Sequence, residues 1–310
     1  MRKAAVRLPW CAAGFAAVAA AAVTGCASST STSGASAATT SPANPLSTVQ
    51  LAAKSTSAVN TVTGTISVQA TAASGATASP GTSGSAGSGA LAFTGTFAEQ
   101  LRPSLLASFD IQSITSSGTS LPGGLSEIIT PSSLYLKSPA LSQALHVSKP
   151  WLAIPLSQLG KSSGVNFSQL LGGVNSNAPL SGSQLLAGAT AVRRVGTSTL
   201  DGVPVTEYTG TLSLDKALSS LSGTNKTALQ QAITAAGFST AKFTVWIDGK
   251  NMLRKSVVTE AGKTVTEVTT TTITSTGQPV HVTVPAASQT APLPSSATSG
   301  SSSGSSGTVS

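Results

Sequence analysis

Residues Thr240–Thr274 read TAKFTVWIDGKNMLRKSVVTEAGKTVTEVTTTTIT, and the fold follows from the period of this stretch. Phe243, Val245 and Ile247 alternate with polar residues, and a period of two is typical of a strand that buries one face. An Asp-Gly pair at 248–249 and a glycine at 262 are turn signals that divide the stretch. We therefore predict consecutive antiparallel strands at 240–248, 252–260 and 264–274.

Segments with strand or helix patterns fill the rest of the chain. The Asp201-Gly202 pair is a strong hairpin signal, and Asn44-Pro45 is typical of a helix start. An α+β fold is indicated, in which helices gather on one face of a large antiparallel sheet. The further strands are predicted at 61–70, 91–100, 105–114, 132–137, 149–154, 190–199, 203–212 and 280–284, and the helices at 46–58, 139–145, 165–171, 181–187, 214–221 and 224–237.

The N-terminal segment indicates export. Three cations precede an uncharged run, Leu8–Val23, which is followed by Thr24, Gly25 and Cys26. A positive start, an apolar centre and small residues before a cleavage point are the parts of a signal peptide, which we place at 1–25. The cysteine at that point is similar to a bacterial lipobox. This likeness implies a diacylglycerol on the Cys26 sulfur, incorporation of palmitate, and a location on the extracytoplasmic face of the cell membrane.

Two other interpretations of this segment are an ordinary signal peptide and a transmembrane anchor. The uncharged run has about 16 residues, fewer than the roughly 20 that a spanning helix needs. An ordinary signal peptide does not account for a cysteine at the cleavage point. We therefore favour the lipoprotein.

Composition divides the remainder into three parts. Residues 26–43 are rich in serine and threonine and are predicted to form a tether, and residues 286–310 are predicted to be a disordered Ser/Gly tail. The domain between them spans 44–285. Because Cys11 lies in the signal peptide and Cys26 is lipidated, we expect no disulfide in the mature protein.

The charge is basic but dispersed. Seventeen basic residues face nine acidic ones, and three of the basic residues lie in the signal segment. Nucleic-acid binding needs clustered cations with stacking aromatic residues, which this sequence lacks. The dispersed positive charge is better explained by weak attraction to an anionic membrane. We predict a monomer that binds no nucleic acid.

No pattern of residues predicts catalysis, a metal or a cofactor. Outside the signal peptide the sequence offers two histidines, His146 and His281, and no free cysteine, so a metal site of the usual spacing is not expected. Sequence alone does not bring any two carboxylates together, so an acid–base pair is possible but unsupported. We predict a protein that is not an enzyme. The carboxylates are Glu99, Asp110, Glu127, Asp201, Glu207, Asp215, Asp248, Glu260 and Glu267.

One face of the predicted sheet is apolar, and the helices that could cover it are short and rich in alanine. Such a face either packs a modest core or leaves a cavity, and apolar cavities bind apolar ligands. A filled core without ligand is at least as well supported by these residues alone. The candidate cavity residues are Val62, Ile66, Phe93, Phe97, Phe109, Phe243, Val245 and Ile247.

Several short motifs resemble the actinobacterial lipoprotein family of the LppX/LprG type. The matching segments are Ser133–Lys137, Lys149–Trp151, Val195–Val203 with Tyr208, Val245–Asp248 and Leu253–Lys255. The resemblance spans roughly residues 45–284. It implies a curved half-barrel sheet with short helices on its concave face, like that of the LolA/LolB carriers that move lipoproteins across the periplasm. It also implies an apolar cavity for acylated envelope lipids or glycolipids.

The leading hypothesis is a membrane-anchored lipoprotein of the cell envelope that binds or carries an acylated lipid in an apolar cavity. Burial of each CH₂ group contributes about 0.8 kcal/mol, so an apolar face of this size could hold one or two acyl chains. The alternative is an interaction or sensor lipoprotein with a filled core that binds a protein or a cell-wall glycan.

Overall fold

A computed structural model of the chain describes residues 44–72, 90–116, 119–120, 123–157, 185–219, 230, 240–262 and 265–294. The predicted signal peptide, Cys26 and the tether lie outside these residues. So do the predicted helix at 165–171 and, except for Gln230, the one at 224–237. The remainder folds into a single sheet with short helices.

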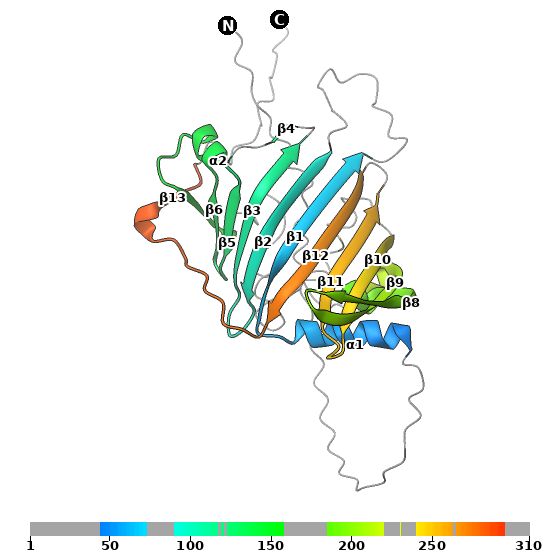
Figure 1. Ribbon diagram of the computed structural model, residues 1–310. Helices are drawn as coiled ribbons and strands as arrows, with labels where there is room; N and C mark the ends of the chain where they lie inside the picture. Colours follow the sequence, from blue (N-terminus) through cyan, green and yellow to red (C-terminus); the bar gives the residue numbers. More distant parts are fainter. Residues whose placement is uncertain are drawn as a thin grey trace, which may run out of the picture.

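The sheet has 13 strands in the order β13-β7-β6-β5-β3-β2-β1-β12-β11-β10-β9-β8, with β4 paired to β3 (Figure 1). All pairs are antiparallel except β13 with β7. The sheet is curved and does not close, so the predicted half-barrel α+β fold is confirmed. The strands are β1 (Thr61–Ala72), β2 (Leu91–Gln100), β3 (Leu106–Ser116), β4 (Thr119–Ser120), β5 (Leu125–Ile129), β6 (Ser133–Lys137), β7 (Trp151–Pro155), β8 (Ala189–Leu200), β9 (Val203–Ser213), β10 (Thr240–Asp248), β11 (Leu253–Ala261), β12 (Val265–Thr276) and β13 (Thr290–Pro292).

Threonine makes the outer face of the central strands polar. On β1 the inward Val62 and Val68 are buried, while outward threonines such as Thr63 alternate with them. Threonine is branched at Cβ and fits a pleated sheet, and its hydroxyl can bond across strands. The hydroxyls of Thr63 and Thr274 lie 3.1 Å apart. Strand β1 therefore has a hydroxyl-rich outer face and an apolar inner face.

Two predicted turns are confirmed. Asp201 and Gly202 both have positive φ, as a two-residue hairpin between β8 and β9 requires. At the β10–β11 turn the buried Asp248 carboxylate accepts hydrogen bonds from the backbone N–H groups of Lys250 and Met252, both at 2.9 Å. Its second oxygen accepts from Arg254 Nε at 2.9 Å. This network fixes the turn.

Helix α1 (Pro45–Ser57) packs against strands at one end of the sheet. Asn44 Oδ1 accepts a hydrogen bond from Leu46 N at 3.0 Å, which confirms the predicted cap. Val49 and Ala52 are fully buried, and α1 contacts β8, β10, β11 and the 3₁₀ helix η1 (Leu185–Gly188). The fully buried Thr56 hydroxyl accepts from Leu253 N at 2.9 Å and so ties the helix to β11.

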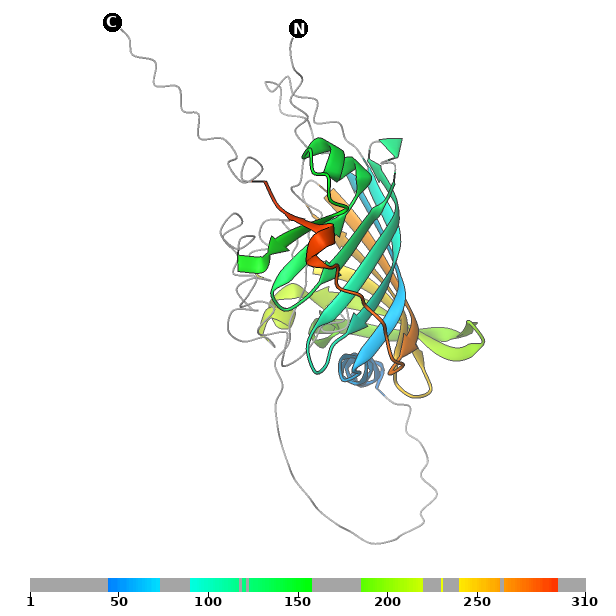
Figure 2. The same ribbon diagram turned by 90° about the vertical axis from the view of Figure 1, so that its left-hand side faces the viewer.

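The other helices are shorter. Helix α5 (Leu214–Ser219) contacts η1 and β9, beside α1, whereas α2 (Pro139–Ala144) lies near β6, at the other side of the sheet (Figures 1 and 2). At the start of α5 the Ser213 Oγ accepts a hydrogen bond from Lys216 N at 3.4 Å. Of the described residues, no helix is long and apolar enough to cross a membrane.

The C-terminal part differs from two predictions. Residues 280–284 are not a strand, because both sides of β12 are already paired, with β1 and β11. The chain instead crosses to β7, where residues 287–289 form the 3₁₀ helix η2 and β13 pairs in parallel. The predicted disorder from Ala286 onward is therefore wrong for residues 286–294. The free edge of β7 explains it, since an edge strand offers unpaired backbone groups. Lys149 Nζ also donates to the Ser288 carbonyl oxygen.

Strand β5 was not predicted from the sequence. Its five residues, LSEII, contain too short an alternation to stand out, and β3 and β6 supply its pairing partners. Of the predicted helix at 181–187, the structure describes the residues from Leu185 onward, and these belong to the 3₁₀ helix η1.

Candidate functional site

The strand register places all eight predicted cavity residues on one face of the sheet. Phe97 is paired with Gly64 and with Phe109, and Phe243 follows on the far side through β12 and β11. Five of the eight belong to the largest buried cluster: Val62, Phe97, Phe243, Val245 and Ile247. Phe93 belongs to a second cluster, and Ile66 and Phe109 are partly buried. Their role in a cavity remains a prediction.

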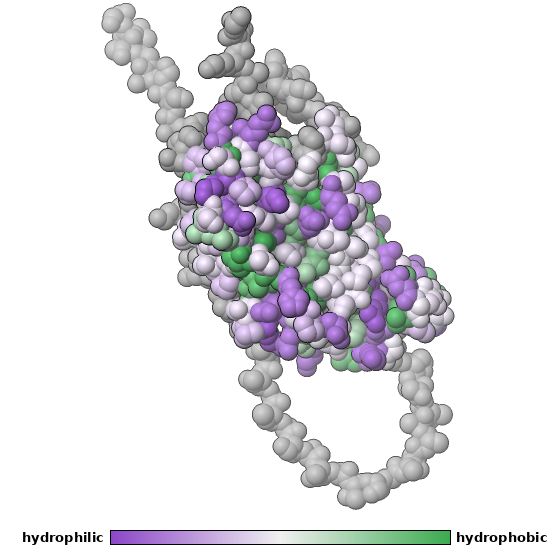
Figure 3. Space-filling view, turned by 60° about the vertical axis from the view of Figure 1, so that its left-hand side comes forward, coloured by the Kyte–Doolittle hydropathy of each residue, from purple (hydrophilic) through white to green (hydrophobic). Residues whose placement is uncertain are grey.

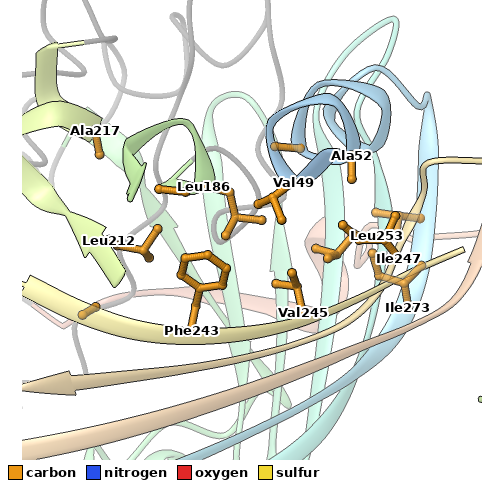
Figure 4. Packing of buried hydrophobic residues seen from close by; sticks show 14 of the residues in the cluster. Val49, Ala52, Leu186, Leu212, Ala217, Phe243, Val245, Ile247, Leu253 and Ile273 are labelled. Carbon is orange, nitrogen blue, oxygen red and sulfur yellow. The ribbon is translucent and has the colours of Figure 1, made fainter. Parts of the chain in front are cut away.

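Under the helices the inner face is filled. Val49 and Ala52 of α1 point toward Val245 and Ile247, while Leu186 of η1 lies above Phe243 (Figure 4). Each of these six side chains is at most 3% exposed. We call this region the helix-covered core; it consists of Val49, Ala52, Thr56, Leu186, Leu212, Phe243, Val245, Ile247 and Leu253.

Two glycines let aromatic rings lie against the sheet. A Cβ atom on Gly210 would be 2.7 Å from Phe243 Cζ, and one on Gly64 would be 2.6 Å from Phe97 Cζ. At Gly64 a Cβ atom would also collide with the backbone oxygen of Thr272, so this position has no room for a side chain. The rings of Phe97 and Phe243 therefore lie directly over the backbone of neighbouring strands, at Gly64 and Gly210.

The apolar inner face continues on β1, β2, β3, β6 and β7. Phe93, Val68 and Ile111 form a second buried cluster across β1, β2 and β3. Leu136, Leu152 and Ile154 form a third on β6 and β7, with Leu141 of α2 packed against it. Figure 3 shows the outer surface from the β5–β6 side, where small hydrophobic patches lie among weakly polar and strongly hydrophilic residues.

Two carboxyl groups interrupt this apolar face. Glu99 of β2 is paired with Val62 on one side and Ala107 on the other, and it therefore faces inward. The residue as a whole keeps some accessible surface, but its Oε2 atom is buried and has no hydrogen-bond partner among the described residues. Burial raises the pKa of Glu99 to about 8. At neutral pH the group is therefore mostly protonated.

Glu127 lies nearby on the same face. It is buried, and its register partners are Phe109 on β3 and Leu136 on β6. Burial raises its pKa to about 7. Strand β3 separates Glu127 from Glu99, with an offset of two residues, so their Cα atoms are about 12 Å apart. We call this region the carboxyl-bearing face; it consists of Phe97, Glu99, Ala107, Phe109, Glu127 and Ile129.

A second pair of carboxyls faces inward at the opposite end of the sheet from α1. Glu260 of β11 and Glu267 of β12 are directly paired. The pKa of Glu260 is raised to about 7, first by burial and second by the charge of Glu267. Burial also raises the pKa of Glu267, which the hydrogen bond from Thr269 Oγ1 partly offsets. In the described chain no three residues are grouped as metal ligands.

Sequence reasoning did not identify these four inward carboxyls as a group. Glu99 has the same parity as Phe93 and Phe97, so the alternation of its strand could have placed it on the inner face. Glu127 has no such signal, because β5 was missed. The pairing of Glu260 with Glu267 depends on the register of β11 against β12. Both histidines are outside this face: His146 lies between α2 and β7, and His281 is exposed beyond β12.

The chain has counterparts among solved structures but not among sequence families. No family model and no curated protein matches its sequence. The fold is similar to LprF from Mycobacterium bovis, with 14% identity and a TM-score of 0.46 over 78% of this chain and 97% of that one. It is also similar to the lipoprotein LppX from Mycobacterium tuberculosis, with 17% identity and a TM-score of 0.44 over 77% and 98%. LppX is of the lipoprotein type that the sequence motifs resemble.

Proposed function

We propose that this protein is an extracytoplasmic lipoprotein that holds or carries an acylated envelope lipid against the inner face of its sheet. The observation that supports it is the apolar inner face, which continues from the helix-covered core onto β1, β2, β3 and β5. It contains Phe93, Phe97 and Phe109. Acyl chains need contact of this kind rather than specific polar groups. The protein would act as a monomer and without catalysis.

Lipid release in native mass spectrometry tests this proposal. The full chain with Cys26→Ser, expressed in a bacterium, should carry a bound lipid that appears as an added mass and disappears on denaturation. Consistent absence of lipid across preparations and growth conditions contradicts the proposal. The substitution removes the anchor, so any lipid that remains is held by the fold.

We further propose that Cys26 anchors the protein to the membrane through a diacylglycerol. Cys26→Ser should abolish incorporation of radiolabelled palmitate and release the protein from the membrane fraction. Retention of the label in the variant would refute this assignment. The result is independent of whether the sheet binds lipid.

A second candidate function is supported by the dense packing of the helix-covered core. A sheet that is filled in this way can serve as an interaction or sensor domain, with a protein or a cell-wall glycan bound at its surface. Under this function the chain carries no lipid in native mass spectrometry. A pull-down with peptidoglycan or envelope extract then identifies the partner.

A further inference from the structure

We propose that the Glu99 carboxyl is a recognition point for the hydroxyl group of a neutral acylglycerol, an inference that rests on the proposed function. The side chain lies on the inner face of β2 between Val62 and Ala107, two small apolar neighbours that offer no hydrogen bond. Its Oε2 atom is shielded from water and is without a partner in the part of the chain that the structure describes. A bound group would restore the hydrogen bond that burial removes.

An unpartnered oxygen at this position is unusual. Buried side-chain polar atoms almost always have a partner, and within the part of the chain that the structure describes Glu99 Oε2 is the one exception. A leucine would avoid the cost of burial at the same place in the strand. The carboxyl thus lowers the stability of the empty fold, which indicates a partner that comes with the ligand.

The surroundings of Glu99 select a neutral partner. In strands β1–β7 the single basic residue is Lys137, which lies on the outer face with its Nζ 5.8 Å from the Trp151 ring centroid. Arg102, three residues beyond Glu99, is exposed, and its Nη1 donates a hydrogen bond to the Ala58 carbonyl oxygen at 3.0 Å. An anionic headgroup would therefore be buried without a counter-charge from these strands. A cationic headgroup would require an ionised Glu99, and so a buried ion pair with two desolvation costs.

A hydroxyl group matches the protonated form that Glu99 takes at neutral pH. A protonated carboxyl donates one hydrogen bond and accepts others, and a hydroxyl group does the same. Because burial raises the pKa of Glu99 to about 8, this form dominates at pH 7. The position of Glu99 and its protonation state therefore both favour a neutral hydroxyl group as its partner.

Aromatic rings beside Glu99 provide the apolar part of the site. Phe97 precedes Glu99 by two residues on the same face, and its ring centroid is 6.2 Å from that of Phe109. An acyl chain attached to the hydroxyl-bearing headgroup can lie along these rings while the headgroup meets the carboxyl. A diacylglycerol, with two chains and one free hydroxyl, has the required groups.

Three lipids that share two oleoyl chains test the inference: 1,2-dioleoylglycerol, its 3-acetyl ester and dioleoylphosphatidate. Binding to the delipidated full chain with Cys26→Ser is followed by displacement of an apolar fluorescent probe. We expect dioleoylglycerol to bind about tenfold more tightly than the acetyl ester, which lacks the hydroxyl, and phosphatidate to bind most weakly. In a Glu99→Leu background this preference should disappear while the acetyl ester still binds.

Variants separate recognition from a structural role. Glu99→Gln keeps a donor and an acceptor and should retain the preference. Glu267→Leu changes an inward carboxyl about 27 Å away along β1, since its register partner Ala70 lies eight residues from Val62, and should also retain it. Glu99→Leu should raise the melting temperature of the lipid-free protein while weakening dioleoylglycerol binding. If Glu99→Leu does not fold, Glu99→Met provides the same comparison.

Three results overturn the inference. The first is equal binding of dioleoylglycerol and its acetyl ester by the unsubstituted Glu99 protein, which leaves the proposed function intact. The second is an unchanged preference in Glu99→Leu. The third is tighter binding of a cationic dioleoyl lipid than of dioleoylglycerol, which would assign Glu99 to an ion pair. Failure of every lipid to bind contradicts the proposed function itself, and with it this inference.

Discussion

The helix-covered core and the carboxyl-bearing face belong to one apolar layer, but their buried polar groups differ in hydrogen bonding. In the helix-covered core the Thr56 hydroxyl accepts from Leu253 N, and the nearby Asp248 carboxylate is fully engaged in its turn. On the carboxyl-bearing face Glu99 Oε2 has no partner among the described residues. The first region is built for stability of the empty protein. The second retains an unmet hydrogen bond, as a binding site does.

Loss of an aromatic ring should produce the largest difference between the two regions. Phe243→Ala removes a side chain that is 1% exposed, and we expect a loss of about 3–5 kcal/mol in the free energy of unfolding. Phe109→Ala, at a partly buried position, should cost about half as much. Urea unfolding of the lipid-free protein measures both. Equal losses would show that the two regions are packed alike.

The buried hydroxyl of the helix-covered core should come next. Thr56→Val keeps the shape of the side chain but leaves the Leu253 N–H without its acceptor, at a cost of about 1–3 kcal/mol. Thr63→Val is a matched control on the outer face and should change stability by less than about 0.5 kcal/mol. Thermal unfolding checks this pair. A silent Thr56→Val would mean that water or another group replaces the hydroxyl.

The carboxyl-bearing face should make stability depend on pH. Between pH 4.5 and about 8 the folded protein retains a Glu99 proton that the unfolded chain has lost, so the free energy of unfolding should fall as pH rises through this window. A fully buried group with this shift would contribute about 5 kcal/mol, and because Glu99 keeps some accessible surface the expected fall is on the order of 2 kcal/mol. Glu99→Gln should remove much of it, as measured by urea midpoints from pH 5 to 8.5. A slope that is the same in both proteins would contradict the buried state of Glu99.

The smallest effect is expected at the pair of carboxyls far from α1. Glu267→Gln removes a like charge opposite Glu260 and should lower the pKa of Glu260 while it stabilises the protein by about 0.5 kcal/mol at pH 8. Carboxyl chemical shifts in an NMR titration report the pKa directly. An unchanged Glu260 titration would show that burial alone sets its value.

The local sequence pattern was sufficient to predict most strands and turns. It was not sufficient to predict short strands that form only by pairing with a neighbouring strand. The alternation around Phe243, Val245 and Ile247 predicted β10 and its inward face, and Asp201-Gly202 predicted the β8–β9 hairpin. In contrast, β5 is five residues long and β13 is three, and each forms because a neighbouring strand has an unpaired edge. Such edges exist only after the fold is assembled.

For the candidate site, the sequence predicted which side chains face inward but not which of them have hydrogen-bond partners. The apolar side chains of the inner face follow from parity, and the same parity contained Glu99, whose strand alternates Phe93, Phe97 and Glu99 with outward residues. That its oxygen is unpartnered could not follow from sequence, because hydrogen bonding depends on residues of other strands. Glu127 and the Glu260–Glu267 pair likewise depend on strand register.

The assignment of the inner face to lipid binding depends on whether the folded chain contains lipid at all. Native mass spectra of the full chain with Cys26→Ser, recorded after expression in a lipid-containing bacterium, answer this question. The account predicts a folded population whose mass exceeds that of the chain by one acylated lipid, and a loss of that mass on denaturation. A folded population with only the mass of the chain, in every preparation, would contradict it.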